Sequence, residues 1–526
     1  MVTRVTARAE AQKTAGTVAK KVVKGVQKNV TRAVSGTLGL SGERMSKVDT
    51  AWLRMDSAAN LMMIVGVWQL APGVKYAAVC ERIENSLLKY DRFRQRVVED
   101  AAGATWVMDR NFDLANHVVL EQLPKPAKGV KTTGGGQQEA LQDRVAELAM
   151  QPLDPKRPLW QIHLIEDYTG PDGVKGSAMI VRIHHCIADG IALISVTMSL
   201  VDGGAPPPER RKKEATGGGA EDWIADTLLR PFTDMTVRAL GAAGDGAVRS
   251  LGMLGDPKKG MEVGMNGSMD MAKVLFQVLK DSAALALMPD DSKTRLKGKP
   301  GGAKKVAWCQ PIPLDEVKAV GKALNCSIND VLLSCVAGAI GEYLKSHGDD
   351  VTGQEIRAMV PVNLRPMEQA YKLGNRFGLV PLVLPIGMDN PVERIYEVRR
   401  RMGALKGSFQ PLLAFSLLAI AGLLIKPAQD AMLNLFSKKT TAVMTNVPGP
   451  REKLTFCGST LEQSMFWVPQ SGDVGLGVSI LSYGGGVQFG VITDSTLCPD
   501  PQRIIDEFEP EFAKLSIVTM MLPWGE

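Results

Sequence analysis

The segment GSAMIVRIHHCIADGIALISVTMSLV, residues 176–201, determines the fold that we expect for the first half of this chain. Residues Gly176 to Ile183 form an apolar run typical of a buried strand, and Ile191 to Val201 have the composition of a helix. The heptapeptide HHCIADG, residues 184–190, falls between the two. The segment therefore predicts that two adjacent histidines lie at a strand-to-helix turn.

His184 and His185 are two of five histidines in the chain. Successive side chains of a strand point to opposite faces, so one of the pair is expected to do chemistry while the other helps to hold the turn. Imidazole suits the removal of a proton from a hydroxyl group, because its pKa of about 6.5 leaves it mostly neutral at cellular pH. Two other interpretations stay open. One is a polar cap of the strand, and the other is a metal site with His185 and Asp189 as ligands, although a third ligand at fixed spacing and an HExxH motif are missing.

Outside this segment the pattern is mixed α/β, because stretches with apolar residues every three or four positions alternate with short apolar runs. Helices are expected at 77–90, 140–150, 314–323 and 328–344. Strand-like runs surround Val360, Val380 and Val487. A serine hydrolase and a phosphate-binding NTPase both lack their expected motifs, since neither a GxSxG nor a P-loop pattern occurs.

Composition divides the chain into four parts. We expect a basic extension at 1–40, an N-terminal α/β domain at 41–205, a partly helical linker or insertion at 206–302 and a C-terminal domain at 303–526. The first 40 residues carry eight basic side chains and one acidic side chain. They fit either a basic amphipathic helix on an anionic membrane surface or a solvated tail.

The bulk composition is that of a soluble globular protein, with 45% apolar and 22% charged residues and a net charge of +6. This modest charge gives no reason to expect nucleic-acid binding. Because the seven cysteines include no CxxC pair and no apolar signal segment follows the first basic residues, a reducing cytoplasm is expected. The apolar stretch 407–425 is interpreted as a buried or surface-docking helix rather than a membrane span, since it is near the lower length limit for spanning and contains Pro411.

The HHxxxDG pattern resembles the active-site motif of the CoA-dependent acyltransferase superfamily, and further segments narrow the resemblance to one family. PLW at 158–160, ND at 329–330 and NVPGP at 446–450 are similar to motifs of the bacterial wax ester synthase/acyl-CoA:diacylglycerol acyltransferase family. The match is completed by Met45-Ser46 with Asp49 and Trp52, by segments 361–365 and 374–378, and by Ser482-Tyr483 with Asp494. The resemblance extends over residues 41–518.

The resemblance implies an α/β fold of two chloramphenicol-acetyltransferase-like domains, with the active-site tunnel at their interface. It also implies that His185 is the general base. The catalytic set comprises His184, His185, Asp189, Gly190 and Asn329.

Asp189 is interpreted as a structural residue, because in the superfamily the corresponding aspartate pairs with an arginine; Arg365 is the expected partner. Asn329 either supports the tetrahedral intermediate or, together with Ser327 and Asp330, only organises the start of a helix. Structural or tunnel-forming roles are implied for Pro158, Leu159, Trp160, Asp330, Arg365, Asn446, Pro448, Gly449 and Pro450.

The reaction that the resemblance implies is the transfer of a fatty acyl group from acyl-CoA to diacylglycerol or to a long-chain alcohol, in a ternary complex without an acyl-enzyme. Acyl-CoA is then a co-substrate, and no cofactor or metal is expected. Two alternatives stay open: the same fold acylating a sterol, sugar or amine, and a non-catalytic protein that binds lipid surfaces. The expected location is the cytoplasm, peripherally associated with the inner membrane or with lipid inclusions.

Overall fold

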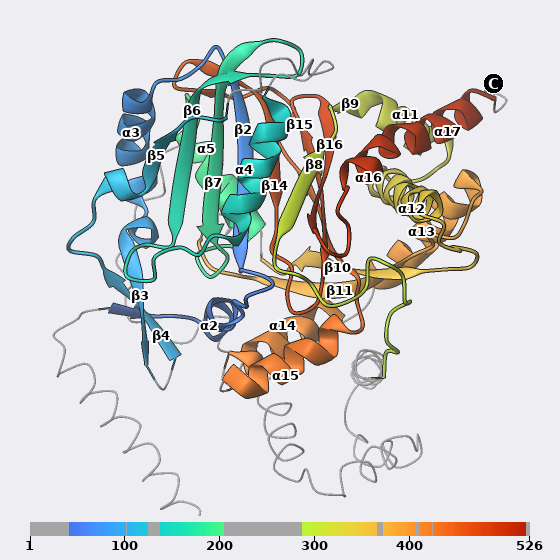
Figure 1. The fold of residues 1–526 in the computed structure, drawn as a ribbon, viewed down its shortest axis with the longest axis horizontal. Coiled ribbons are helices and arrows are strands. Elements are labelled where there is room, and N and C mark those ends of the chain that lie inside the picture. Colours follow the sequence, from blue (N-terminus) through green and yellow to red (C-terminus); the bar gives the residue numbers. More distant parts are fainter. Residues whose placement is uncertain are drawn as a thin grey trace, which may run out of the picture.

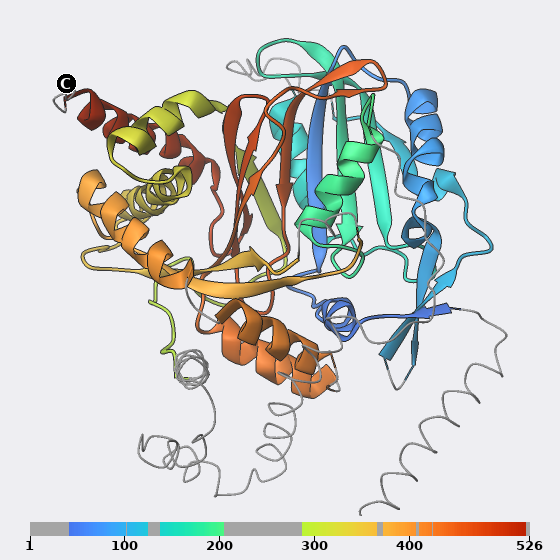
Figure 2. The ribbon, with the colours of Figure 1, turned by 180° about the vertical axis from the view of Figure 1, so that it is seen from behind.

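The computed structural model of this protein describes residues 42–100, 103–124, 137–204, 287–365, 372–406, 410–422, 424 and 426–521. The predictions for the basic extension at 1–40 and for most of the linker at 206–302 lie outside these residues. The predicted mixed α/β fold is present and is built around two large sheets that stand side by side (Figures 1 and 2).

The first sheet contains the strand that carries the histidines. Its strand order is β13-β14-β2-β7-β6-β5, and each pair is antiparallel except β5 with β6. Its strands are β2 (Met63–Ala71), β5 (Val118–Glu121), β6 (Trp160–Thr169), β7 (Lys175–His184), β13 (Thr455–Phe456) and β14 (Ser459–Trp467).

The two faces of this sheet bury different side chains, because successive residues of a strand point to opposite faces. Val65 and Val67 of β2 pack in one cluster with helix α4 (Gln138–Met150). Trp68 and Leu70 pack on the other face, with helices α3 (Tyr76–Asn85) and α5 (Gly190–Leu200). The central strand β2 is thus covered on both sides.

The second sheet has the order β11-β10-β12-β15-β16-β8, and β9 pairs with β16. Its strands are β8 (Lys304–Trp308), β9 (Ile312–Pro313), β10 (Ile356–Asn363), β11 (Phe377–Leu384), β12 (Ala442–Pro448), β15 (Leu476–Tyr483) and β16 (Gly486–Asp494). Helix α12 (Ile328–Ser346) is the core helix of this half, since every residue from Asp330 to Leu344 except Glu342 is buried. The helices packed around it are α11 (Leu314–Ala323), α13 (Pro391–Lys406), α16 (Gln502–Asp506) and α17 (Phe508–Met521).

One pair of strands departs from the predicted division at residue 303. β13 and β14 come from the C-terminal part of the chain, yet β14 pairs with β2 in the first sheet. Leu461, Met465 and Trp467 of β14 are buried there. An apolar strand from the second half therefore covers the edge of β2, which would otherwise present unpaired backbone groups. The end of the expected linker also departs from the prediction, because Leu296 is buried in the core of the second half.

Smaller elements lie below the two sheets in Figure 1. A three-stranded sheet has the order β1-β4-β3, with β1 (Gly42–Arg44), β3 (Gln95–Asp100) and β4 (Gly103–Met108). Helix α2 (Lys47–Arg54) packs against α14 (Gln410–Ala421), which also packs on β11 and is followed by α15 (Lys426–Ser437). These contacts bring α2 into the space between the halves.

The predicted helices are present, and one of them is shorter than expected. α4, α5, α11 and α12 begin and end within two residues of the expected bounds. The helix expected at 77–90 ends at Asn85, and the chain continues in 3-10 turns at Leu87–Lys89 and Asp91–Arg94. Asn85 and Ser86 both have low helix propensity, which favours an end of the helix at this point.

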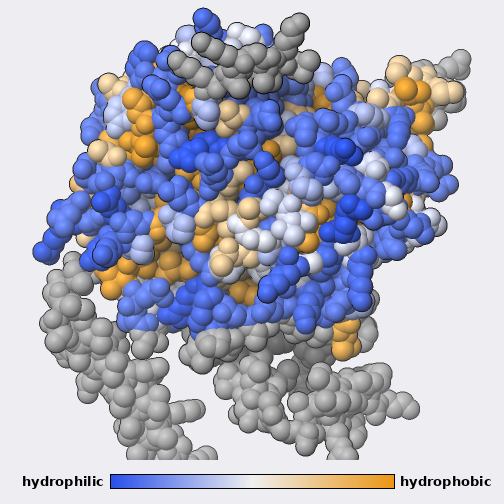
Figure 3. Space-filling model, viewed as in Figure 1, coloured by the Kyte–Doolittle hydropathy of each residue, from blue (hydrophilic) through white to orange (hydrophobic). Residues whose placement is uncertain are grey.

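Within the ranges that the structure describes, no single helix is both long and apolar enough to cross a membrane. The bent pair α11 and α12 meets that criterion only when the two are taken together. The stretch expected to form one apolar helix contains the 12-residue helix α14. Figure 3 shows a mostly hydrophilic surface with hydrophobic residues near the end of α17, where Ile517, Met520 and Met521 are exposed.

Candidate active site

The histidine turn connects the end of β7 to the start of α5, as the sequence predicts. The backbone of neighbouring strands holds both histidines. The N–H of His184 donates to the carbonyl of Leu159 at 3.0 Å, and the N–H of His185 donates to the carbonyl of Met62 at 2.7 Å. Leu159 and Met62 directly precede β6 and β2, so the turn is anchored between two strands of the first sheet.

The imidazole of His185 lies between two aromatic rings from different parts of the chain. Trp52 of α2 stacks on it with ring centroids 4.3 Å apart and an interplanar angle of 12°. Phe377, the first residue of β11, lies 5.5 Å away at a tilt of 43°. His185 is 3% exposed, and this burial lowers its pKa to about 4. The ring is therefore neutral near pH 7 and able to accept a proton.

His184 makes contacts of a different kind. Its Nδ1 accepts a hydrogen bond from the N–H of Cys186 at 3.2 Å, and its Nε2 lies 3.4 Å from Oδ1 of Asp56. The same Asp56 oxygen accepts from the N–H of Met62 at 2.6 Å. His184 thus supports the loop that holds His185. In the part of the chain that the structure describes, no group of three or more His, Cys, Asp or Glu residues is placed to hold a metal ion.

Asp189 faces a buried network and not the His185 ring. It caps α5 by accepting from the N–H of Ala192 at 3.0 Å. Its other oxygen accepts from Nη2 of Arg365 at 2.8 Å and from the N–H of Arg376 at 2.9 Å. Arg365 also donates to the carbonyl of Gly374 at 2.6 Å. The predicted ion pair between Asp189 and Arg365 is therefore present, and both residues are 4% exposed.

Asn375 links the histidine turn to α2. Its Nδ2 donates to the carbonyl of His185 at 2.7 Å and to Oδ1 of Asp49 at 2.8 Å, while its backbone N–H donates to the same oxygen at 3.0 Å. Burial raises the pKa of Asp49. Asp49, Trp52 and Asn375 had no role in the sequence prediction, although all three stand in segments that carry the family resemblance.

Asn329 lies at the start of α12, and the structure places it in contact with another predicted residue. Its Oδ1 accepts from Nδ2 of Asn446 at 3.0 Å. The helix cap is made by its neighbours, because Ser327 and Asp330 form a reciprocal capping box. Asn329 is exposed and takes no part in this cap. Among the described residues, no hydrogen bond or ring contact connects Asn329 with His185.

The PLW segment supports the first sheet. Pro158, Leu159 and Trp160 are buried, and the indole N–H of Trp160 donates to the carbonyl of Phe93 at 2.8 Å. Trp160 also stacks on His117 with centroids 4.6 Å apart. These contacts fit the predicted structural role.

The NVPGP segment ends β12 and forms a tight approach to β15. The N–H of Gly449 donates to the carbonyl of Ser482 at 2.7 Å, and a Cβ at Gly449 would lie 2.6 Å from that oxygen. Only glycine fits this approach. The carbonyl of Pro450 accepts from the N–H of Gly484 at 3.0 Å. Pro448 pairs with Ser482 at the end of the strand.

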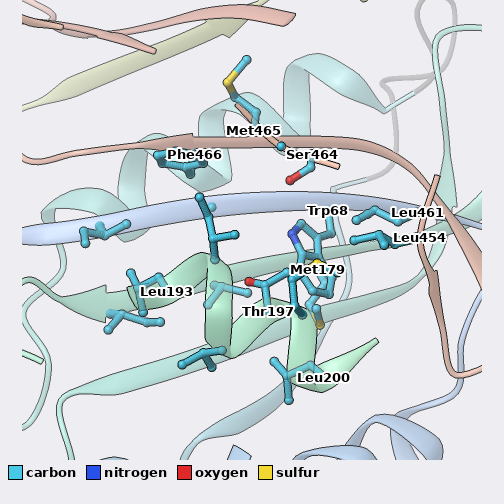
Figure 4. Close-up of a pocket in the computed structure, with 18 of the residues that line it drawn as sticks. Trp68, Met179, Leu193, Thr197, Leu200, Leu454, Leu461, Ser464, Met465 and Phe466 are labelled. Atoms are coloured by element: carbon cyan, nitrogen blue, oxygen red, sulfur yellow. The ribbon is translucent and has the colours of Figure 1, made fainter. Parts of the chain in front are cut away.

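An apolar cavity of about 150 Å³ begins beside the histidine turn and runs between α5 and the first sheet (Figure 4). Ile183 and Gly190, which flank the turn, line one part of it, and Leu200 and Phe456 line another. A Cβ at Gly190 would meet no atom within 4 Å, so a larger residue there would project into free space. Gly449 and Pro450 bring the NVPGP segment to the cavity wall. Of these lining residues, Gly190, Gly449 and Pro450 had been named from the sequence, whereas Ile183, Leu200 and Phe456 had been given no role.

Two family models match this chain. The model described as the wax ester synthase/diacylglycerol acyltransferase catalytic domain matches residues 45–332, and the model described as the WS/DGAT C-terminal domain matches residues 373–516. Together they include the histidine turn, Asn329, Asn375 and the NVPGP segment.

Individual proteins resemble the chain over most of its length. A probable diacylglycerol O-acyltransferase of Mycobacterium tuberculosis is 26% identical over 490 residues, covering 90% of this chain and 96% of that protein. Wax ester synthase/diacylglycerol acyltransferase 8 of Arabidopsis thaliana is 24% identical, with coverages of 84% and 89%. The solved structure of the wax ester synthase/diacylglycerol acyltransferase of Marinobacter aquaeolei VT8 superimposes with a TM-score of 0.59 at 20% identity, covering 91% of this chain and all of that one.

Proposed function

Because the chain belongs to the wax ester synthase/diacylglycerol acyltransferase family, we propose that it transfers a fatty acyl group from acyl-CoA to the hydroxyl group of a lipid alcohol, with His185 as the general base. The acyltransferase chemistry is that of the family. The acceptor and the residue roles are our proposal.

The observation that carries this proposal is a neutral histidine ring beside an apolar cavity. A general base must be unprotonated before it reacts, and burial of His185 keeps its pKa at about 4. Ile183 and Gly190 lie on either side of the histidine pair and also line the cavity. His185 itself does not line the cavity, so the proposal places the reacting end of a fatty chain at the part of the cavity formed by Ile183 and Gly190, next to the histidine turn.

The reaction proceeds in one ternary complex. His185 accepts the proton of the acceptor hydroxyl as its oxygen attacks the thioester carbonyl carbon. The C–S bond then breaks, and the imidazolium returns the proton to the leaving thiolate, which gives the ester and free CoA. Trp52 and Phe377 hold the ring in one orientation during both transfers.

Asn329 is our candidate for a hydrogen-bond donor to the tetrahedral intermediate. Its side-chain oxygen is occupied by Asn446, and its neighbours Ser327 and Asp330 supply the helix cap. The amide N–H₂ group of Asn329 is thus left to donate to a ligand. One such donor typically contributes about 3 kcal/mol to transition-state stabilisation.

The proposed acceptors are diacylglycerol and long-chain alcohols. The Mycobacterium tuberculosis relative is named as a diacylglycerol O-acyltransferase, and the names of the Arabidopsis and Marinobacter proteins include wax ester synthase. Both reactions use a primary or secondary hydroxyl group and the same base. Acyl-CoA is the co-substrate in each.

We also propose that the protein works at a lipid surface, because both substrates carry long apolar chains. The exposed Ile517, Met520 and Met521 of α17 support this proposal. Flotation of the full-length protein with anionic vesicles is the expected result, and full recovery in the lipid-free fraction would contradict it.

The direct test measures CoA release by the purified protein given palmitoyl-CoA with hexadecanol or with a diacylglycerol. Release should require the acceptor, and His185→Gln should reduce it by about 10³-fold or more, since the base is lost. His347→Gln is a matched control, because His347 lies at the end of α12 and contacts Tyr343 and Asp500. Equal activity of His185→Gln and the wild type would contradict the proposed base.

A further inference from the structure

The cavity beneath α5 is apolar except for a small group of polar atoms. Thr197 of α5, Ser464 of β14 and Trp68 of β2 all line it. Within the part of the chain that the structure describes, no hydrogen bond to the protein is found for either hydroxyl or for the indole N–H. Thr197 and Ser464 are half-buried and Trp68 is 8% exposed, so water in the cavity can reach these groups. An unpaired polar group inside an apolar cavity costs free energy unless a ligand or water satisfies it.

Neighbouring hydroxyl groups are satisfied by the protein itself. Tyr483, which also lines the cavity, donates to the carbonyl of Leu461 at 2.8 Å and accepts from the N–H of Leu454 at 2.7 Å. Ser199 of α5 donates to the carbonyl of Val196 at 2.7 Å. A helical threonine can bond in the same way to a carbonyl of the preceding turn. Thr197 does not, so its hydroxyl remains available to the cavity.

The three polar groups come together from two walls. Ser464 and Trp68 are direct partners in the pairing of β14 with β2, so their side chains are neighbours on one face of the sheet. Thr197 approaches from α5 on the opposite wall. Figure 4 shows Trp68 between Ser464 and Thr197. We call these three residues the polar cluster.

The distance between the polar cluster and the histidine turn follows from the geometry of α5 and β2. Thr197 follows Gly190 by seven residues, which is about 10 Å along a helix. Trp68 follows Met63 by five residues, which is about 16 Å along a strand, and Met63 pairs with His184. An extended alkyl chain advances about 1.3 Å per carbon for a C–C bond near 1.5 Å. The cluster therefore meets a chain about eight to twelve carbons from the reacting group.

We propose that the cavity binds a long aliphatic chain that carries a hydroxyl or keto oxygen near its middle, and that Thr197, Ser464 and Trp68 recognise this oxygen. A hydroxyl oxygen on the chain accepts from the Trp68 indole, and its proton goes to either side-chain hydroxyl. A plain chain leaves all three groups unpaired. This proposal rests on the proposed function, since it concerns the substrates of the same reaction.

The test compares 12-hydroxystearoyl-CoA with stearoyl-CoA, using hexadecanol as the acceptor. The wild type should show kcat/KM about threefold to tenfold higher for the hydroxylated chain, as one or two hydrogen bonds provide. 3-Hydroxystearoyl-CoA should show no such gain, because its hydroxyl lies near the reacting end. A second arm asks whether the cavity holds the chain of the acceptor instead of the acyl chain. It keeps stearoyl-CoA as the acyl donor and compares 1,12-octadecanediol with octadecanol as the acceptor.

Variants test the named residues. Thr197→Val and Ser464→Ala should each lower the preference for the hydroxylated chain, and the double variant should lower it by about threefold to tenfold, because the two hydroxyls are alternative partners of the same proton. Ser199→Ala, on the same helix but already satisfied by the protein, should leave the preference unchanged. A wild type without a preference for the hydroxylated chain in either arm, or variants with an unchanged preference, would overturn the proposal.

A binding measurement separates this proposal from the catalytic one. Calorimetry with the His185→Ala protein compares the affinities of 12-hydroxystearoyl-CoA and stearoyl-CoA without turnover. Tighter binding of the hydroxylated ligand, lost in the added Thr197→Val substitution, supports the polar cluster even if no acyl transfer occurs. Equal affinities, together with equal kcat/KM for the two acceptors of the second arm, would overturn it even if the enzyme is active on palmitoyl-CoA.

Discussion

The indole of Trp52 lies almost parallel to the imidazole of His185, with 4.3 Å between the ring centroids. Trp52 belongs to α2, which Asp49 and Asn375 also attach to the histidine turn. A short helix at the start of the described chain thereby controls both the orientation and the burial of the proposed base.

Replacement of Trp52 by leucine should raise the pKa of His185 and slow the reaction. Water would reach the ring, so the burial that lowers the pKa to about 4 would weaken and the value would move toward 6.5. We expect kcat to fall about tenfold to a hundredfold through loss of orientation. Trp52→Phe should retain most activity. The pH dependence of kcat/KM measures the pKa of His185 in each protein. An unchanged acidic pKa in Trp52→Leu would show that the stacked indole does not set the pKa of His185.

The wild-type pH profile should be flat from pH 7 down to about pH 5 and should fall by half near pH 4. This follows because the reaction needs neutral His185, whose pKa is lowered to about 4 by burial. Initial rates of CoA release across this range are the measurement. Tryptophan fluorescence recorded in parallel separates loss of the base from unfolding. If the activity of the folded protein fell by half near pH 6.5 instead, that result would contradict the lowered pKa of the buried His185 ring.

The lowered pKa of His185 should also make this residue destabilise the folded protein in mild acid. Between pH 6.5 and pH 4 the unfolded chain binds a proton on this ring and the folded chain does not, so the free energy of unfolding falls as the pH falls. His185 alone contributes a slope of about 1.4 kcal/mol per pH unit in this window. Urea unfolding of His185→Gln, compared with the wild type at several pH values, should show a shallower dependence. The same pH dependence of the free energy of unfolding in both proteins would argue against a lowered pKa of His185.

Removal of one partner of the Asp189–Arg365 pair should destabilise the protein strongly. Both side chains are buried, so Arg365→Met leaves an uncompensated carboxylate at an expected cost of about 3–5 kcal/mol. The double variant with Asp189→Asn should recover part of this loss. Urea unfolding of the wild type, both single variants and the double variant measures the coupling. Additive effects would show that the pair is not energetically linked.

Substitution of Asn329 should affect the rate rather than stability. Asn329→Ala removes the proposed donor, so kcat should fall by about 10²-fold to 10³-fold. Ser327→Ala is the matched control, because it breaks the helix cap beside Asn329 and should cost about 1 kcal/mol of stability instead. An Asn329→Ala enzyme with normal kcat and reduced stability would reverse this assignment.

Local pattern predicted the elements near the histidines well. The strand, the turn and the helix of residues 176–201 follow from composition and apolar periodicity, which are local properties. The pairing of Asp189 with Arg365 was accessible through the resemblance, which supplies a long-range contact that local pattern lacks. The end of α3 was missed because helical periodicity continues past Asn85 and Ser86.

Contacts between distant segments set the rest of the site. The stacking of Trp52 on His185 joins α2 to a turn more than a hundred residues later, and neither segment's periodicity indicates the partner. Thr197 and Ser464 are polar residues whose local sequence marks no site, and only the pairing of β14 with β2 brings Ser464 beside Trp68. Asn329 is a further case, since its hydrogen bond to Asn446 depends on where α12 and β12 meet.

The pairing of β14 with β2 makes the half that carries the histidine turn depend on the rest of the chain for one strand of its sheet. A fragment that stopped after α5 would carry every atom of the histidine turn, yet it would lack Ser464, Met465 and Phe466 from the cavity wall and would leave the edge of β2 open to other chains. Genes that encoded the two halves separately would therefore produce polypeptides that depend on each other, and co-expression would allow the missing strand to be supplied in trans. The shared strand makes substrate binding a property of the whole chain.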